Sequence, residues 1–163
     1  AKELARHIPP GVLKIGVFVD APREEIERAF KEVPLDYIQF HGNENSEFIK
    51  KIRLPSIKVL SVHGVEDVKE AAYYEVDYLL FDTPGKEFKG GSGETFDWHL
   101  LNDVGVPINK LILAGGLNVE NVGEAVRRVN PYMVDVSSGV EVNKRKDEKL
   151  IRAFIHAVKD EER

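Results

Sequence analysis

Short runs of apolar, mostly β-branched residues recur along this chain at nearly constant spacing, and this repeat constrains the fold more than any other feature. The runs begin about every 20 to 23 residues, with one longer gap before Leu111. They are Lys14–Val19, Tyr37–His41, Ile57–Val62, Tyr78–Thr83, Leu111–Ala114 and Met133–Val136. Continuous apolar runs of this length are typical of parallel strands that are covered on both faces.

The segments between these runs carry helical patterns with recognisable starts. We expect Asp20 to cap a helix whose first turn contains Pro22, and Asn118 to cap a helix over Val119–Val129. The other predicted helices are Glu47–Ile52 after Asn45-Ser46, Glu66–Tyr74, Phe96–Asn102 and Lys146–Lys159. Strand–helix alternation with short connections predicts a parallel α/β fold. A repeat of about 20 residues is typical of a TIM (β/α)8 barrel.

Six predicted strands are two fewer than such a barrel contains. Ala1–Ile8 has the pattern of the last turns of a helix that began earlier, because no N-cap precedes it and Pro9-Pro10-Gly11 stops it. A six-stranded arc would leave two open parallel edges. We therefore expect one domain over residues 1–163 that lacks two N-terminal βα units. The alternative is a closed barrel or a doubly wound sheet of six strands.

Composition excludes several classes of function. Hydrophobic residues make up 42% of the chain and charged residues 31%, which fits a soluble globular protein. The net charge is −5 and there is no basic stripe, so we expect no nucleic-acid partner. No apolar run approaches the roughly 18 residues of a membrane span, and no signal peptide opens the chain, so we expect a cytoplasmic protein.

Metal and thiol chemistry are also not indicated. The chain has no cysteine, which excludes disulfides and thiolate metal sites. Its histidines are scattered, and neither an HExxH motif nor a carboxylate cluster is present, so we expect no metal.

Glycine and serine turns follow the last two predicted strands. Glycines let a backbone approach a ligand closely, and both N–H groups at a helix start and serine hydroxyls attract an anion. Two such turns on neighbouring final strands match the usual phosphate site of these barrels. We therefore predict a phosphate-binding site at Gly115, Gly116, Ser137, Ser138 and Gly139. Ordinary tight turns are the alternative.

Asp82 ends the apolar run Tyr78–Thr83, so its carboxyl should stand at the barrel mouth, partly desolvated. Desolvation favours the protonated form of a carboxyl, which predicts a general acid. The alternative is a carboxylate that caps the next turn through Thr83. The following segment, Pro84–Thr95, is long and rich in glycine, so we expect it to fold over substrate; a disordered connector is the alternative.

Three further polar side chains are candidate pocket residues. Gln39 and His41 share one face of their strand, because side chains alternate, and both should point into the barrel near its mouth. Asp135 should point inward from the last strand, two residues before Ser137. Each has an alternative: His41 as a structural hydrogen-bonded histidine, and Asp135 as a carboxylate that only orients the turn.

Six segments of the chain match a known family in order and spacing. They are Ile15–Val19, Ile38–Gly42, Leu80–Thr83, Gly90–Trp98, Ala114–Val122 and Val134–Glu141. The combination of GGSGETFDW, GGLNVENV and VDVSSGVE is highly specific. On these residues the chain resembles the phosphoribosylanthranilate isomerase family of tryptophan biosynthesis, from residue 1 to the C-terminus.

The resemblance implies a closed (β/α)8 barrel and a cofactor-free Amadori rearrangement of N-(5′-phosphoribosyl)anthranilate to 1-(2-carboxyphenylamino)-1-deoxyribulose 5-phosphate. It implies that Asp82 is the general acid that protonates the ribose ring oxygen, and that the glycine and serine turns hold the phosphate of this small-molecule substrate. A homodimer is one assembly that we consider.

The chain departs from the family pattern at the general base. In the family this base is a cysteine on the first strand, within a Lys-Ile-Cys-Gly motif, and an arginine after the second strand pairs with the anthranilate carboxylate. This chain has no cysteine and no such motif. A phosphosugar-binding fragment without catalytic activity is therefore the alternative function. Other phosphosugar barrels, such as indole-glycerol-phosphate or histidine-pathway relatives, lack the GGSGETFDW match.

Overall fold

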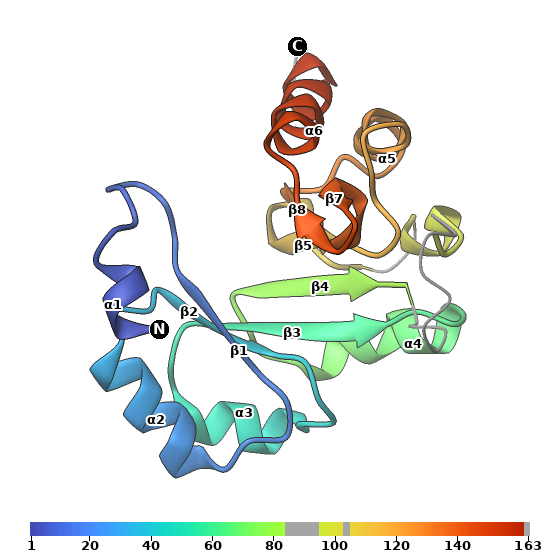
Figure 1. The fold of residues 1–163 in the computed structure, drawn as a ribbon. Helices are drawn as coiled ribbons and strands as arrows, with labels where there is room; N and C mark the ends of the chain where they lie inside the picture. Colours follow the sequence, from blue (N-terminus) through green and yellow to red (C-terminus); the bar gives the residue numbers. More distant parts are fainter. Residues whose placement is uncertain (84–94, 103–104, 162–163) are drawn as a thin grey trace. The chain divides into compact units, whose positions relative to one another are not determined.

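A computed structural model describes residues 1–83, 95–102 and 105–161 of the chain (Figure 1). The described residues form two compact units. The first unit comprises residues 1–59 and 72–79, and the second comprises the described part of residues 60–71 and 80–163.

The strands of the main sheet lie within two residues of the predicted apolar runs. They are β1 (Ile15–Phe18), β2 (Tyr37–Phe40), β3 (Ser56–Ser61), β4 (Tyr78–Asp82), β5 (Leu111–Leu113) and β6 (Met133–Val134). Their hydrogen-bonded order follows the chain, and the pairs β1–β2, β2–β3 and β5–β6 are parallel. Consecutive β–α units of a (β/α)8 barrel produce this order, so the predicted fold class is confirmed.

The first unit contains helices α1 (Lys2–Ala5), α2 (Arg23–Glu32) and α3 (Ser46–Ile52). Helices α2 and α3 lie on one side of β1 and β2 (Figure 1). Helix α3 begins as predicted, because the Asn45 side chain accepts a hydrogen bond from the Phe48 amide. The core of this unit consists of apolar side chains from α2, α3, β2 and β3. They are Ile26, Ile38, Phe40, Ile49, Ile52 and Ile57.

The predicted capping role of Asp20 is wrong. Helix α2 has Pro22 at its N-cap and no side-chain capping bond. Asp20 adopts a left-handed backbone conformation, with φ of 50°, and its carboxylate accepts a hydrogen bond of 2.6 Å from the Asn43 amide. The side chain therefore joins the loop after β1 to the loop after β2 instead of starting the helix, because an Asp side chain can bond to amides outside its own segment.

Carboxylates brace the beginnings of the strands in this unit. Asp36 precedes β2, and its Oδ2 accepts hydrogen bonds of 2.6 Å from the Lys14 amide and of 2.8 Å from the Lys14 ammonium. These bonds hold the pKa of the Asp36 carboxyl below its ordinary value of 3.8. Asp77 makes a comparable bond of 2.8 Å to the Ser56 amide at the start of β3.

Because its pKa is lowered in the folded state, Asp36 should stabilise the fold above pH 3.8 and lose this effect as the pH falls through the folded value. We expect Asp36→Asn to lower the urea midpoint at neutral pH, and the difference from wild type to shrink under acid. Urea unfolding across a pH series measures this. Glu75→Gln, at an exposed ion pair with Lys50, is the control and should change little. A difference that grows under acid would contradict the assignment.

The second unit contains α4 (Val65–Lys69), α5 (Val122–Val129) and α6 (Glu148–Glu161). Helices α5 and α6 pack against each other, and Arg127 pairs with Glu161. Short 3₁₀ segments complete this part of the chain: η1 (Glu70–Tyr73), which crosses into the first unit, η2 (Trp98–Leu101), η3 (Ile108–Lys110) and η4 (Ser138–Val140). Phe81, Leu113, Val122, Ala125 and Phe154 are among its buried side chains.

Three predicted helices of this unit differ from the structure. Helix α5 begins at Val122, because the Asn118 side chain accepts bonds from the amides of Glu120 and Asn121 and closes a turn before the helix. The segment predicted as helical over Phe96–Asn102 is the 3₁₀ helix η2, which Asp97 caps. Helix α6 starts only after a hairpin of β7 (Glu141–Val142) and β8 (Arg145–Lys146).

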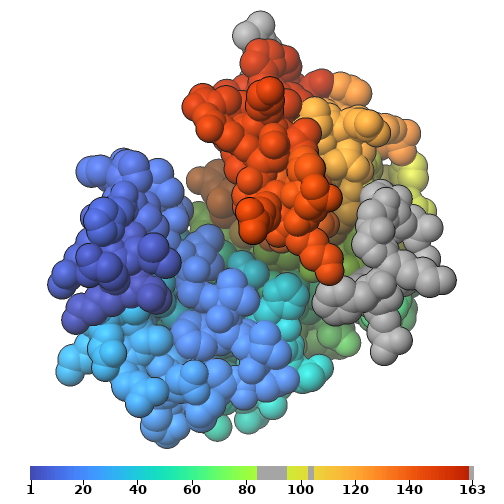
Figure 2. All heavy atoms as spheres, in the orientation of Figure 1, coloured from blue at the N-terminus to red at the C-terminus, as the bar shows by residue number. Residues whose placement is uncertain are grey.

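That hairpin was not predicted. Its turn residues, Asn143 and Lys144, have φ of 51° and 61°, which is the geometry of a type I′ turn. Residues 142–146 are exposed, and this segment lies on the visible surface in the space-filling view (Figure 2).

Candidate functional site

Asp82 is the last residue of β4 and is partly buried. The Phe81 carbonyl accepts a bond of 2.8 Å from the Ala114 amide, and the Asp82 carbonyl accepts one of 2.9 Å from the Val62 amide. These bonds fix the backbone of Asp82 between the ends of β3 and β5. The Thr83 hydroxyl that follows accepts a bond of 3.1 Å from the Phe96 amide. Residues 84–94 of the predicted loop Pro84–Thr95 lie outside the described residues.

The turn after β5 lies directly against the residue that follows Asp82. Gly115 and Gly116 have φ of 82° and 67°, a conformation that side chains with a Cβ rarely adopt. A Cβ placed on Gly115 would overlap the Thr83 amide and would lie 2.6 Å from the Thr83 Cβ. Glycine is therefore required here, both for the turn and for the close approach to Thr83.

The turn after β6 lies against the turn after β5. A Cβ on Gly139 would overlap the Leu117 carbonyl and would lie 3.0 Å from the Asn118 Cα. The structure thus brings the ends of β4, β5 and β6 together in one unit, with Asp82, Gly115, Gly116 and Gly139 in consecutive contact through Thr83 and Leu117. Ser137 and Ser138 precede Gly139 and are exposed at this edge.

Two side chains that the sequence did not single out orient these turns. The Asn121 side-chain amide donates a bond of 3.0 Å to the Gly116 carbonyl. The Lys146 ammonium donates one of 2.8 Å to the Ser137 carbonyl and also pairs with Glu141 at 2.8 Å. In a trans peptide the carbonyl and the following N–H point in opposite directions. The Leu117 N–H group therefore points away from the Asn121 side chain, and the Ser138 N–H group points away from the Lys146 side chain.

The remaining predicted pocket residues lie in different places. Asp135 follows β6, donates its amide to the Leu113 carbonyl at 2.9 Å, and has an exposed side chain. Gln39 and His41 belong to the first unit, where Gln39 is partly buried within β2 and His41 follows that strand. All three stay predicted pocket residues.

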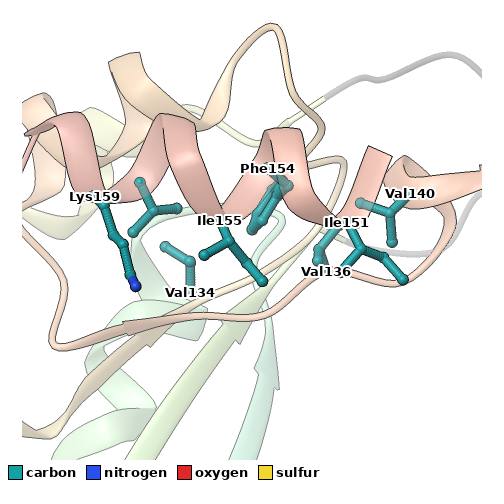
Figure 3. Close-up of a pocket in the computed structure, with 8 residues that line it drawn as sticks. Val134, Val136, Val140, Ile151, Phe154, Ile155 and Lys159 are labelled. Atoms are coloured by element: carbon teal, nitrogen blue, oxygen red, sulfur yellow. The ribbon is translucent and has the colours of Figure 1, made fainter. Parts of the chain in front are cut away.

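An apolar cavity of about 330 Å³ lies between β6 and α6 (Figure 3). Val134 of β6 and Val136 just after it contribute to its wall, together with Phe154 and Ile155 of the helix. The alternation of side chains places these valines on the opposite face from Asp135. Apart from Lys159 its lining side chains are all apolar and offer the hydroxyls of a sugar no hydrogen-bond partner, so the cavity is not suited to a phosphosugar.

Within residues 1–83, 95–102 and 105–161, no group of three or more His, Cys, Asp or Glu side chains could hold a metal ion. None of the helices described there has the length and apolar character needed to cross a bilayer.

Comparison with known proteins identifies relatives over nearly the whole chain. The family model of N-(5′-phosphoribosyl)anthranilate (PRA) isomerase matches residues 1–157. The N-(5′-phosphoribosyl)anthranilate isomerase of Bacillus cereus strain ATCC 14579 is 48% identical over 161 residues, which are 98% of this chain and 80% of that relative.

Solved structures agree with the sequence match. The phosphoribosyl anthranilate isomerase of Thermotoga maritima superposes with a TM-score of 0.86 at 40% identity, covering 98% of this chain and 78% of that one. A phosphoribosyl anthranilate isomerase bound to reduced 1-(o-carboxyphenylamino)-1-deoxyribulose 5-phosphate superposes with a TM-score of 0.82 at 36% identity, covering 98% and 77%.

Proposed function

Because the chain belongs to the N-(5′-phosphoribosyl)anthranilate isomerase family, we propose that it serves that family's reaction, the cofactor-free Amadori rearrangement of N-(5′-phosphoribosyl)anthranilate. The observation that carries the assignment of the site is the contact between three consecutive strand ends. They bring a carboxyl, Asp82, next to two turns that favour an anion. In barrels of this family the carboxyl ends of the strands hold the substrate.

Asp82 is the proposed general acid. Protonation of the ribose ring oxygen by its carboxyl allows the bond between that oxygen and C1 to break, because the anilino nitrogen supplies its electron pair and forms a Schiff base with C1. Removal of the proton from C2 then gives an enamine, which rearranges to the ketone of the product. The partial burial of Asp82 at the end of β4 supports this role.

The turns at Gly115-Gly116 and Ser137–Gly139 are the proposed phosphate site. Carbonyls of both turns are engaged by Asn121 and Lys146, which directs the following N–H groups the other way. Backbone N–H groups and serine hydroxyls are the donors that phosphate sites of this kind use. The Lys146 ammonium, which is paired with the Glu141 carboxylate, also donates to the Ser137 hydroxyl at 3.3 Å.

The proton at C2 requires a base. The chain contains no cysteine, the residue type that the resemblance implies for this step. It matches 80% of the length of the Bacillus cereus relative, so about one-fifth of that relative has no counterpart in the match. We propose that the 163 residues carry the acid and the phosphate site, and that full turnover requires a segment bearing the base.

A homodimer also stays a prediction; one relative, from Thermotoga maritima, is described as a dimeric isomerase.

Isomerisation assays test this proposal. We expect the chain alone to bind the reduced product analogue but to turn over substrate slowly. Mixing it with a polypeptide comprising the unmatched fifth of the Bacillus cereus relative should raise turnover by about 10²–10⁴-fold, the usual contribution of a positioned base. A mixture that neither turns over substrate nor binds the analogue would refute the proposed function.

A further inference from the structure

A buried ion pair joins the loops after β1 and β2 in the first unit. The side chains of Lys58, on β3, and Glu44, in the loop after β2, are only 3% and 2% exposed. The Lys58 ammonium donates to Glu44 Oε2 at 3.1 Å and to the Gly42 carbonyl at 2.6 Å. Tyr74 lies over this pair, with its ring centroid 5.7 Å from the ammonium.

The carboxylate of Glu44 binds the backbone of both loops. Its Oε1 accepts a bond of 2.8 Å from the Asp20 amide, and its Oε2 accepts one of 2.9 Å from the Gly42 amide. Asp20 follows β1 and Gly42 follows β2, so one side chain fixes the carboxyl ends of two neighbouring strands. A Cβ on Gly42 would lie 2.6 Å from the Asp20 amide nitrogen, which shows how closely the loops approach.

His41 lies within the segment that these bonds hold. Its amide donates to the Phe18 carbonyl at 2.8 Å, and Gly42, which follows it, is bound at both its amide and its carbonyl. The backbone on either side of the His41 side chain is therefore fixed by β1 and by the Lys58–Glu44 pair.

The position of the pair argues for a role beyond stability. A buried ion pair often contributes no more to stability than an apolar pair of similar volume. The carboxylates of Asp36 and Asp77 brace the beginnings of strands, which in this fold is the end associated with stability. Glu44 and Lys58 act at the opposite end, where substrate is held.

We infer that Glu44 and Lys58 are positioning residues, which hold the loops after β1 and β2, with His41 between them, in the conformation that receives the phosphosugar. This inference rests on the proposed function. We do not propose that either side chain contacts the substrate. They act through the backbone of Asp20 and Gly42.

The double variant Glu44→Leu/Lys58→Met separates positioning from stability. It removes both buried charges together and leaves neither of them unpaired, so the melting temperature should fall less than that of either single replacement. The amides of Asp20 and Gly42 lose their acceptor, so their ¹H–¹⁵N signals should shift and their hydrogen exchange should quicken. We expect the Kd for the reduced product analogue to rise about 10- to 100-fold, because small misplacements of binding groups have effects of this size.

Two further variants complete the test. Lys50→Met/Glu75→Gln removes an exposed ion pair of the same unit and should leave the Kd unchanged. Glu44→Gln keeps the shape of the side chain and one acceptor, so its Kd should lie between those of wild type and the double variant. Where the double variant fails to fold, the expected result is a Kd of Glu44→Gln above that of wild type, and an equal Kd contradicts the inference.

The outcomes distinguish the inference from the proposed function. If wild type binds the analogue and both Glu44→Gln and the double variant bind it equally well, the pair has only a structural role and the inference is wrong. If wild type itself does not bind the analogue, the proposed function fails and the inference fails with it.

Discussion

Replacing Asp82 with asparagine is expected to lower isomerase turnover by about 10²–10⁴-fold, the usual contribution of a positioned acid, while the Kd for the reduced product analogue changes little. Asparagine has nearly the same shape as aspartate but cannot supply the proton that the ribose ring oxygen needs when its bond to C1 breaks. Steady-state assays measure the turnover. They use the chain alone or its mixture with the unmatched segment of a relative, whichever preparation is more active. Calorimetric titration measures the Kd for the reduced product analogue.

Asp36→Asn is the matched control for this substitution. It makes the same chemical change in the other unit, at the beginning of a strand, where the carboxyl braces Lys14. We expect it to lower stability and to leave turnover unchanged at temperatures well below unfolding. Equal turnover in Asp82→Asn and wild type would remove Asp82 as the acid. A large loss of analogue affinity in Asp82→Asn would instead make it a binding residue.

The strands could be predicted from the sequence because a parallel strand covered on both faces must be apolar at nearly every position. That requirement leaves a contiguous signal, and the strand ends in turn locate Asp82 and the glycine turns. Helix starts were harder to predict. Asp20 and Asn118 both have side chains suited to capping, but such side chains bond to whichever amide is near, and only the fold determines which amide that is.

Residues that act across long stretches of sequence could not be placed in the same way. Lys146 reaches the Ser137 carbonyl because β7 and β8 form a hairpin whose turn, Asn143-Lys144, contains no glycine and so carries a weak signal. Lys58 did leave a clue, since a charged residue inside a buried strand needs a partner. Its partner Glu44 lies 14 residues away in a loop, and the sequence does not identify it.

The second large effect is expected at the contact between the two phosphate turns. A methyl group on Gly139 would overlap the Leu117 carbonyl and would come within 3.0 Å of the Asn118 Cα, so backbone would have to move. We expect Gly139→Ala to lower the free energy of unfolding by about 1–3 kcal/mol, as overpacking usually does. It should also weaken binding of inorganic phosphate at least about tenfold, because the donors of the two turns would no longer converge.

A second glycine-to-alanine change in the same unit is a control that should change stability in the opposite direction. Gly123 lies in α5, and a methyl group there would meet only the mobile ends of the Glu161 and Arg127 side chains, at 3.2 Å or more. Alanine favours a helix over glycine by about 0.5–1 kcal/mol, so Gly123→Ala should raise the urea midpoint and leave phosphate affinity unchanged. If Gly139→Ala lowers stability but binds phosphate as wild type does, the turns pack together for the fold alone. The phosphate must then be held elsewhere, because the donors at Gly115-Gly116 and Ser137–Gly139 would have moved apart without consequence.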